Sequence, residues 1–478
     1  MRQGHWTTNR TLAVAEWQRF CYYHNQWCVP GGACQAGCRV GVMLAGSGTT
    51  PRTFLFLQGL STSFFVRLAD AITGRGHRVE RINLSGGDRL FWPRLGAVDY
   101  RGRFAGWRSF VGTFMHERGV TDIVLFGDCR PYHRVAVDLA HARGIAVHVF
   151  EEGYFRPEWI TLERGGTNGH SRLPRGPEAY LAEAGEIPEV DRTPVAVSGG
   201  IGRRVRWEIL NQIGTLLLAP LYPHYKRHRS HHPLREMCGW LKRLVKRPFE
   251  RRYAERLSRY LETARPSYFL LPLQLETDYQ IRRHSRFKSM AHVMQEVLES
   301  FARGAPPDSL LVIKRHPLDN GLANFRRQAR RIARRLKLGD RVLVMDGGHL
   351  PTLLSRSAGV VVVNSTSGIS ALHHNRPVAV LGRAIFNLAG LTHQGHLDGF
   401  WRERTPPDPE LYRAFRKVVL TRAQVNGSFF TPKGLNLALA GALERMEVAP
   451  TLEALAQPYS ASSDAPVLET PDSAVLIN

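Results

Sequence analysis

Short apolar segments with the character of β-strands alternate with helical segments along most of this 478-residue chain. The alternation occurs twice, before and after a middle segment that is helical and basic. Strand–helix alternation predicts a parallel, doubly wound sheet, so we expect an α/β protein with two Rossmann-like domains and an active site in the cleft between them. The predicted strands of the first half are 54–57, 79–84, 123–126 and 146–150, with helices over 64–73 and 135–143.

Changes in composition set the expected domain limits. The residues before the first strand are expected to form a poorly ordered extension, and a C-terminal stretch rich in Pro, Ala and Ser predicts disorder. Within the first domain, 165–202 is rich in Gly and Pro and is predicted to be irregular. The expected order is an N-terminal extension (1–51), a first Rossmann-like domain (52–202), a basic helical linker (203–265), a second Rossmann-like domain (266–448) and a disordered tail (449–478).

The chain is strongly basic, with 65 Lys and Arg against 41 Asp and Glu, a net charge of +24 and a pI of about 10.4. This balance indicates an anionic partner, which leaves nucleic acid, an anionic membrane or a phosphorylated substrate open. A generally arginine-rich composition is the alternative explanation. No run reaches the roughly 18–20 apolar residues that span a bilayer, and no signal peptide is recognisable. We therefore expect a cytoplasmic protein.

The six cysteines do not predict a metal site. Those near the N-terminus lack the paired Cys-x-x-Cys spacing of a zinc site. Cys129 and Cys238 are far apart in the sequence, and nothing is inferred from them. We expect reduced cysteines and no metal. The N-terminal cysteines are Cys21, Cys28, Cys34 and Cys38.

Three apolar segments of the second half end in polar clusters. The segment that ends at Leu273 is followed by Gln274 and Asp278. The other two lead into 314–317 (Lys-Arg-His-Pro) and 364–368 (Asn-Ser-Thr-Ser-Gly). Because ligands of α/β domains bind at the carboxyl ends of the strands, these clusters are predicted to form one crevice for a phosphate-bearing ligand.

These clusters, with others in the first half, resemble the retaining β-Kdo glycosyltransferases of bacterial capsule assembly, of the KpsS (LipB) type. The resemblance implies a GT-B architecture in which the second domain binds the donor CMP-Kdo and the first binds the acceptor, without a cofactor. The matching segments run in unbroken order: 57–59, 83 with 86–89, 126–131, 151–157, 273–281, 314–317, 364–372 and 390–396.

The resemblance implies a nucleophile in the second domain. Asp278, four residues after Gln274, matches the aspartate that family members are proposed to use. Its attack on CMP-Kdo would give a glycosyl-enzyme adduct, which the acceptor hydroxyl then displaces with retention of configuration. Glu276 adds a carboxylate without an assigned role. Without the resemblance, Asp278 would be interpreted as a helix cap.

The resemblance also implies a binding site for the CMP phosphate. His316-Pro317 matches a signature found in enzymes that use CMP-sugars, where the histidine bonds the departing phosphate. Lys314 and Arg315 lie beside it, and either of them could add positive charge. The residues alone would equally indicate a turn proline next to a structural histidine. The hydroxyls and amides at the start of a predicted helix are implied phosphate ligands, namely Ser365, Thr366, Ser367 and Gly368.

The first domain is expected to supply the acceptor side. A retaining mechanism needs a base for the acceptor hydroxyl, and Glu151 and Glu152 are both candidates. Asp128 and Arg130 are expected to shape the same face. Arg156 is expected to hold either the Kdo carboxylate or the acceptor phosphate.

The resemblance implies partners as well. The acceptor would be lysophosphatidylglycerol or a related lipid, and transfer would begin the poly-Kdo linker of a capsular polysaccharide, followed by hand-over to a second Kdo transferase and the export machinery. The basic segment 203–252 is predicted to contact the anionic inner face of the inner membrane. A GT-B transferase with another nucleotide sugar and a non-enzymatic membrane- or nucleic-acid-binding module remain as alternatives. Nucleic acid is disfavoured because no helix-turn-helix or RNA-recognition signature is present.

Overall fold

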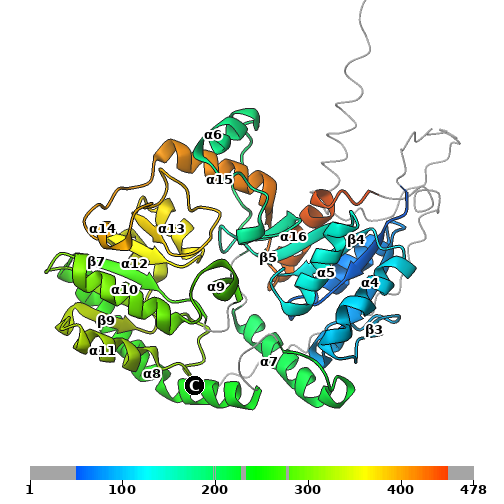
Figure 1. Ribbon diagram of the computed structural model, residues 1–478, viewed down its shortest axis with the longest axis horizontal. Helices are drawn as coiled ribbons and strands as arrows, with labels where there is room; N and C mark the ends of the chain where they lie inside the picture. Colours follow the sequence, from blue (N-terminus) through cyan, green and yellow to red (C-terminus); the bar gives the residue numbers. More distant parts are fainter. Residues whose placement is uncertain (1–49, 198, 200, 228–232, 276–278, 450–478) are drawn as a thin grey trace, which may run out of the picture. The chain divides into compact units, whose positions relative to one another are not determined.

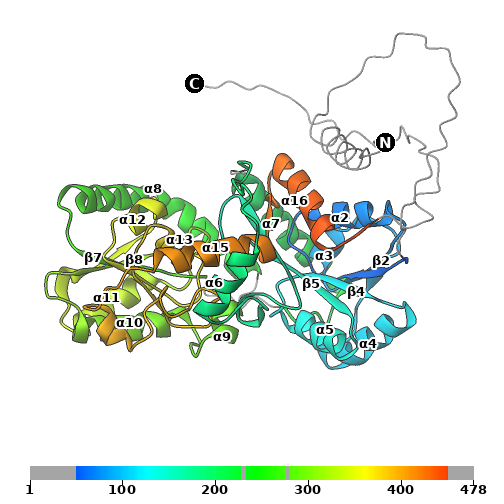
Figure 2. The ribbon, with the colours of Figure 1, turned by 90° about the horizontal axis from the view of Figure 1, so that it is seen from above.

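The computed structural model describes residues 50–449 except 198, 200, 228–232 and 276–278. The predicted N-terminal extension, with its four cysteines, therefore lies almost entirely outside the described residues, and so does the predicted tail. Within the described chain, two sheets form the framework, and each is covered by helices on both faces (Figures 1 and 2). This arrangement confirms the prediction of an α/β fold with two doubly wound units.

The first sheet has the strand order β12-β6-β5-β4-β1-β2-β3. Strands β5, β4, β1, β2 and β3 are parallel to one another, whereas β6 runs antiparallel to β5. Helices α2 (Phe64–Thr73) and α16 (Pro432–Arg445) cover one face, and α4 (Trp107–Glu117) and α5 (Pro131–Ala142) cover the other (Figure 2). The strands are β1 (Thr53–Phe56), β2 (Arg78–Asn83), β3 (Val98–Asp99), β4 (Asp122–Phe126), β5 (Ala146–Glu152), β6 (Trp159–Arg164) and β12 (Gln424–Asn426).

The second sheet is entirely parallel, in the order β11-β10-β7-β8-β9. Its apolar strand residues alternate between two cores, because successive side chains of a strand point to opposite faces. One face is covered by α10 (Met290–Gly304), α11 (Phe325–Arg335) and α14 (Leu397–Phe400), and the other by α12 (Leu350–Ser355), α13 (Ser367–His373) and α15 (Pro409–Ala423). The strands are β7 (Tyr268–Pro272), β8 (Leu310–Lys314), β9 (Val342–Met345), β10 (Gly359–Val362) and β11 (Val378–Val380).

The C-terminal end of the expected second domain belongs to the first sheet. Strand β12 pairs with β6, and α16 packs against core residues of β1 and β4. The Gln424 side chain fixes this pairing, because it accepts a hydrogen bond from Tyr154 N (2.9 Å) and donates one to Thr161 Oγ1 (2.9 Å). The antiparallel strand β6 offers an edge that the returning chain covers. The second sheet begins at β7, close to the predicted limit at 266, but the predicted limit at 448 is too late, because β12 and α16 belong with the first sheet.

A helix lies inside the range that was predicted to be irregular. Helix α6 (Pro177–Glu186) begins with proline at a position where its missing N–H costs nothing. Its Tyr180 is fully buried against Phe415 of α15, with ring centroids 5.3 Å apart. The prediction for 165–202 is wrong at this helix, since its Pro and Gly stand at its first and next-to-last positions, where they do not interrupt it.

Two helices form the basic middle segment, as predicted: α7 (Ile201–Leu217) and α8 (Pro233–Thr263). The short helix α3 (Gly86–Leu90) packs closely on α7. A β-carbon on Gly86 would lie 2.3 Å from the Gly214 carbonyl oxygen, so this contact requires glycine. Among the described residues, no helix combines the length and the apolar composition needed to cross a bilayer.

Candidate functional site

The three predicted strand ends of the second sheet are neighbours. Strand β7 lies between β10 and β8, and all three are parallel, so their carboxyl ends meet at one edge. The side chains also bond across this edge: Gln274 Nε2 donates to Asn364 Oδ1 (2.8 Å), and Asn364 N donates to Gln274 Oε1 (3.3 Å). This pair ties the end of β7 to the loop that begins α13.

His316 follows the end of β8 and is held in one orientation. Its Nδ1 accepts a hydrogen bond from Leu318 N (3.0 Å), which assigns the ring proton to Nε2. Burial, followed by the charge of Arg156, lowers the pKa of His316 to about 4, although Glu152 opposes this shift. At neutral pH the ring is therefore an uncharged donor through Nε2.

Lys314 and Arg315 precede His316 but differ in their surroundings. Both are buried, and burial lowers the pKa of Lys314. Arg315 binds Asp346 (3.1 Å) and Asp319 (3.2 Å), so it joins the ends of β8 and β9. Lys314 is thus the better placed of the two for an anionic ligand.

The loop 364–368 leads into α13, as predicted, but only some of its residues are available as ligands. Ser367 N donates to Ser365 Oγ (3.2 Å), and the hydroxyls of these two serines bond each other (3.2 Å). Thr366 is the residue before the helix and makes no side-chain cap. A β-carbon on Gly368 would lie 2.5 Å from the Phe386 ring, so Gly368 is required by packing. The hydroxyls of the serines are the ligand candidates of this loop.

Glu152, at the end of β5, is surrounded by positive charge. It forms ion pairs with Arg156 (2.9 Å) and with Arg204 of α7. Burial alone would raise the pKa of Glu152, but the two arginines lower it to about 2. His316 also acts electrostatically on this carboxylate. Cys129, which follows β4, also contacts His284, which follows β7, at 3.2 Å. The carboxyl end of the first sheet therefore meets that of the second, in the GT-B manner that the sequence predicts.

Glu151 points in a different direction from Glu152, since the two are successive residues of a strand. A β-carbon on Gly127 would lie 3.3 Å from Glu151 Oε2, which places the carboxylate at the end of β4. Gly127 has a φ of +71°, a conformation that favours glycine. The strand thus directs Glu151 toward β4 and Glu152 toward His316.

Asp128 and Arg130 follow β4 and have separate roles. Arg130 Nη1 donates to Gln58 Oε1 (3.1 Å), and Gln58 Nε2 donates to both oxygens of Asp88 (3.1 Å each). These bonds tie the ends of β4 and β1 to α3. Asp128 accepts from His170 Nδ1 (2.9 Å). Burial alone would raise the pKa of Asp128, but the hydrogen bonds from His170, Cys129 and Thr167 and the charge of His170 together outweigh burial and lower the pKa.

Asp128 belongs to a group that the sequence does not predict, here called the Cys129 cluster: Asp128, Cys129, His170 and His284. The Cys129 thiol donates to Asp128 Oδ1 (3.2 Å) and lies 3.2 Å from His284 Nε2. Cys129 and His284 are 155 positions apart in the sequence, so their spacing gives no signal. Only the meeting of β4, the 3₁₀ helix Asn168–His170 and α9 (Tyr279–His284) brings them together.

Asp278, the predicted nucleophile, and Glu276 lie outside the described residues. Helix α9 begins directly after Asp278, and Gln274 precedes it at the end of β7. The nucleophile assignment therefore stays a prediction.

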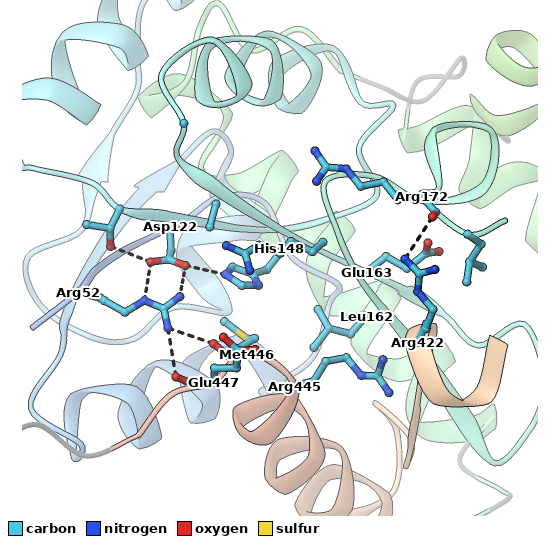
Figure 3. A pocket seen from close by; sticks show the side chains of 15 residues that line it. Arg52, Asp122, His148, Leu162, Glu163, Arg172, Arg422, Arg445, Met446 and Glu447 are labelled. Carbon is cyan, nitrogen blue, oxygen red and sulfur yellow. Dashed lines mark hydrogen bonds and ion pairs between the residues drawn. The ribbon is translucent and has the colours of Figure 1, made fainter. Parts of the chain in front are cut away.

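A separate cavity of about 550 Å³ opens near the amino ends of β4 and β5 (Figure 3). Asp122 binds Arg52 Nε (2.9 Å) and His148 Nε2 (2.7 Å) there. Burial alone would raise the pKa of Asp122, but His148 and Arg52 lower it to about 2. Burial raises the pKa of Glu163 in the same cavity to about 7. The Asp122 network joins β1, β4 and β5 at the edge opposite the candidate site.

Comparison with known proteins gives a family match. A family model described as capsule polysaccharide biosynthesis protein matches residues 121–430. The capsule polysaccharide modification protein LipB of Neisseria meningitidis serogroup B is 36% identical over 384 residues, covering 79% of this chain and 91% of the relative. The capsule polysaccharide export protein KpsS of Escherichia coli is 35% identical over 389 residues, covering 79% of this chain and 97% of the relative.

Among solved structures, the β-Kdo 2,7 transferase of Thermosulfurimonas dismutans KpsC is similar to this chain, with a TM-score of 0.38 and 14% sequence identity. The match covers 82% of this chain and 99% of that one.

Proposed function

This chain belongs to the family of capsule polysaccharide biosynthesis proteins, and we propose that it is a retaining β-Kdo transferase that uses CMP-Kdo as donor. The observation that carries the proposal is the meeting of two strand-end clusters, one with Glu152, Arg156 and Arg204 and one with His316. Such a crevice between two Rossmann-like units offers cationic and hydrogen-bonding groups to a nucleotide sugar.

The second sheet binds the donor in this proposal. The neutral His316 donates through Nε2 to the CMP phosphate, whose negative charge grows as the glycosidic bond breaks. Lys314 and the serine hydroxyls of 364–368 add charge and further donors. Arg156, which is paired to Glu152 but about half exposed, reaches the Kdo carboxylate.

Asp278 is the nucleophile of the proposed mechanism, and Glu151 is the base. The Asp278 carboxylate attacks the anomeric carbon, and CMP leaves with the electrons of the broken bond. Glu151 then takes the proton of the acceptor hydroxyl, whose oxygen displaces Asp278. Glu152 is less suited to this step, because a carboxylate with a pKa of about 2 is a weak base.

The acceptor in this proposal is lysophosphatidylglycerol or a related lipid, so the protein must reach an anionic membrane surface. Exposed apolar side chains recur every four residues on α7 and on α8, where each series forms one stripe of the helix. Lys242, Lys246 and Arg247 lie exposed beside the second stripe. Apolar residues flanked by basic ones are typical of helices that bind anionic bilayers. The apolar residues are Val205, Ile209, Ile213 and Leu217 on α7, and Leu241, Val245 and Phe249 on α8.

Two basic residues that were expected at this surface have other partners. Arg204 pairs with Glu152, and Arg243 binds Asp346 (2.9 Å). The proposed membrane surface therefore consists of the apolar stripes and the exposed basic residues, on the cytoplasmic face of the inner membrane. The product would pass to a second Kdo transferase and then to the export machinery.

One assay tests the transferase proposal. The full chain is incubated with fresh CMP-Kdo and lysophosphatidylglycerol, and the lipid is analysed by mass spectrometry. We expect a mass gain of one Kdo unit, absent with Asp278→Asn. Parallel reactions with UDP-sugars test the alternative donor class. If the folded protein gives no lipid product with CMP-Kdo, the proposal fails, and a product with a UDP-sugar would support the alternative.

A further inference from the structure

The Cys129 cluster brings together three side chains that commonly bind transition metals. A ligand atom from each of Cys129, His170 and His284 lies within 4.8 Å of the other two. Cys129 and His284 are buried, whereas His170 is exposed, so an ion could reach the group from solvent on the His170 side. Thiolate and imidazole are the ligands that zinc prefers in proteins.

The distance between Cys129 and His284 is close to that of two ligands in a zinc site. With Zn–S near 2.3 Å and Zn–N near 2.0–2.1 Å, a tetrahedral ion holds its sulfur and nitrogen ligands about 3.5 Å apart. Cys129 Sγ and His284 Nε2 are 3.2 Å apart, so a small outward movement of the two side chains would admit the ion.

The neighbours of the cluster orient its members. Asp128 accepts a hydrogen bond from His170 Nδ1, so it positions this ligand and leaves His170 Nε2 for the ion. The hydrogen bond that the Cys129 thiol donates to Asp128 is given up when the thiol loses its proton. A β-carbon on Gly169 would lie 2.2 Å from His284 Nδ1, so the backbone packs against that ring and Nε2 is left facing Cys129. Carboxylate–histidine contacts of this kind are usual around zinc.

We propose that Cys129, His170 and His284 form a zinc site, with Asp128 as the residue that positions His170. On binding, the Cys129 thiol loses its proton to solvent and the thiolate becomes a ligand, while the two neutral imidazoles each donate a lone pair. No change of oxidation state is involved. This proposal departs from the expectation, drawn from the sequence, that the protein binds no metal.

The site would fasten α9 to the first sheet. His284 is the last residue of α9, and Cys129 and His170 belong to the first half of the chain. Asp278 lies six residues before His284. A zinc ion at this place would therefore hold the end of α9, the helix that follows the predicted nucleophile in the sequence, without touching substrate itself.

Cobalt substitution tests the site without relying on activity. The full chain is titrated with Co²⁺, and its absorption is followed for the thiolate-to-cobalt charge-transfer band and for the intense visible bands of tetrahedral cobalt. We expect one equivalent to bind, and we expect Zn²⁺ to displace it. Cys129→Ser should abolish the charge-transfer band, and the matched variant Cys238→Ser, at an exposed cysteine, should keep it.

Two further comparisons keep the test decisive. The four N-terminal cysteines are replaced together by serine, and the band should persist. His170→Gln changes an exposed side chain, so the fold of this variant should be unaffected, and Co²⁺ binding should weaken at least tenfold. Asp128→Asn should weaken Co²⁺ binding by about 10–100-fold. The proposal is overturned if the wild-type protein shows no charge-transfer band. It is also overturned if folded Cys129→Ser keeps the band, or if His170→Gln binds Co²⁺ with full affinity.

Discussion

Glu151 and Glu152, at the end of β5, have different surroundings because successive side chains of a strand point to opposite faces. Glu152 is paired with two arginines, and its pKa is about 2. We expect Glu152→Gln to weaken donor binding mainly, seen as a raised KM for CMP-Kdo. Glu151→Gln should lower kcat by about 10²–10⁴-fold, the usual contribution of a general base.

The pH profile separates the two roles further. Because the pKa of Glu152 is about 2, its titration lies below the working pH range of the enzyme. Glu152→Gln should therefore not change how kcat falls as the pH is lowered. Glu151→Gln should lower kcat throughout the pH range, because the base itself is lost. The reverse pattern, with kcat lost only in Glu152→Gln, would exclude Glu151 as the base.

His316 is the residue whose surroundings best fit a phosphate ligand. Its Nε2 hydrogen is not engaged by Leu318, which bonds Nδ1. His316→Ala should weaken CMP binding by about 1–3 kcal/mol, the range for a hydrogen bond to a charged group. Titration calorimetry with CMP measures this change. Ser370→Ala, in the same helix as Ser367 but beyond the loop, is the control and should bind CMP normally. An unchanged affinity in His316→Ala would place the phosphate elsewhere.

At the scale of elements, the first half was predictable because its strands and helices follow one another locally. The predicted segment 64–73 coincides with α2, and 123–126 lies within β4. Strand β12 has three residues, and its partner β6 is more than 250 positions earlier, so only tertiary pairing defines it. The Cys129 cluster escaped prediction for the same reason. The strand ends of the second sheet could be predicted to form one crevice, because strands joined by βαβ connections are parallel and their carboxyl ends lie at the same edge.

The contact between α3 and α7 depends on a glycine pair. A β-carbon on Gly86 would meet the Gly214 carbonyl oxygen at 2.3 Å, and backbone cannot move aside as a flexible side chain can. Gly86→Ala should therefore destabilise the protein by about 1–3 kcal/mol, the usual cost of overpacking. Thermal or urea unfolding measures the change.

Gly202 in α7 provides the matched control. Nothing lies within 4 Å of a β-carbon placed on it, so Gly202→Ala should be neutral or stabilising by up to about 1 kcal/mol through helix propensity. If Gly86→Ala is as stable as Gly202→Ala, the close approach of α3 and α7 is not required.

For the whole molecule, the net charge of +24 raises the question of whether charge alone or one surface mediates membrane binding. Lys242, Lys246 and Arg247 are exposed beside the apolar stripe of α8. Their joint change to Gln should weaken binding to phosphatidylglycerol vesicles by about 3 kcal/mol at low salt, at roughly 1 kcal/mol for each charge. Cosedimentation over a salt series measures this, and the wild-type affinity should fall steeply as salt rises.

The α11 helix offers a control of equal charge. Arg327, Arg331 and Arg334 are exposed there, and their change to Gln removes the same net charge at another place. If the stripes of α7 and α8 form the membrane surface, the α11 variant should bind vesicles nearly as wild type, and Val245→Ser with Phe249→Ser should weaken binding even at high salt. These apolar changes act through lost burial in the bilayer, which salt does not screen. Equal weakening by the two charge variants, with no effect of the apolar changes, would mean that overall charge is responsible and that α7 and α8 are ordinary solvated helices.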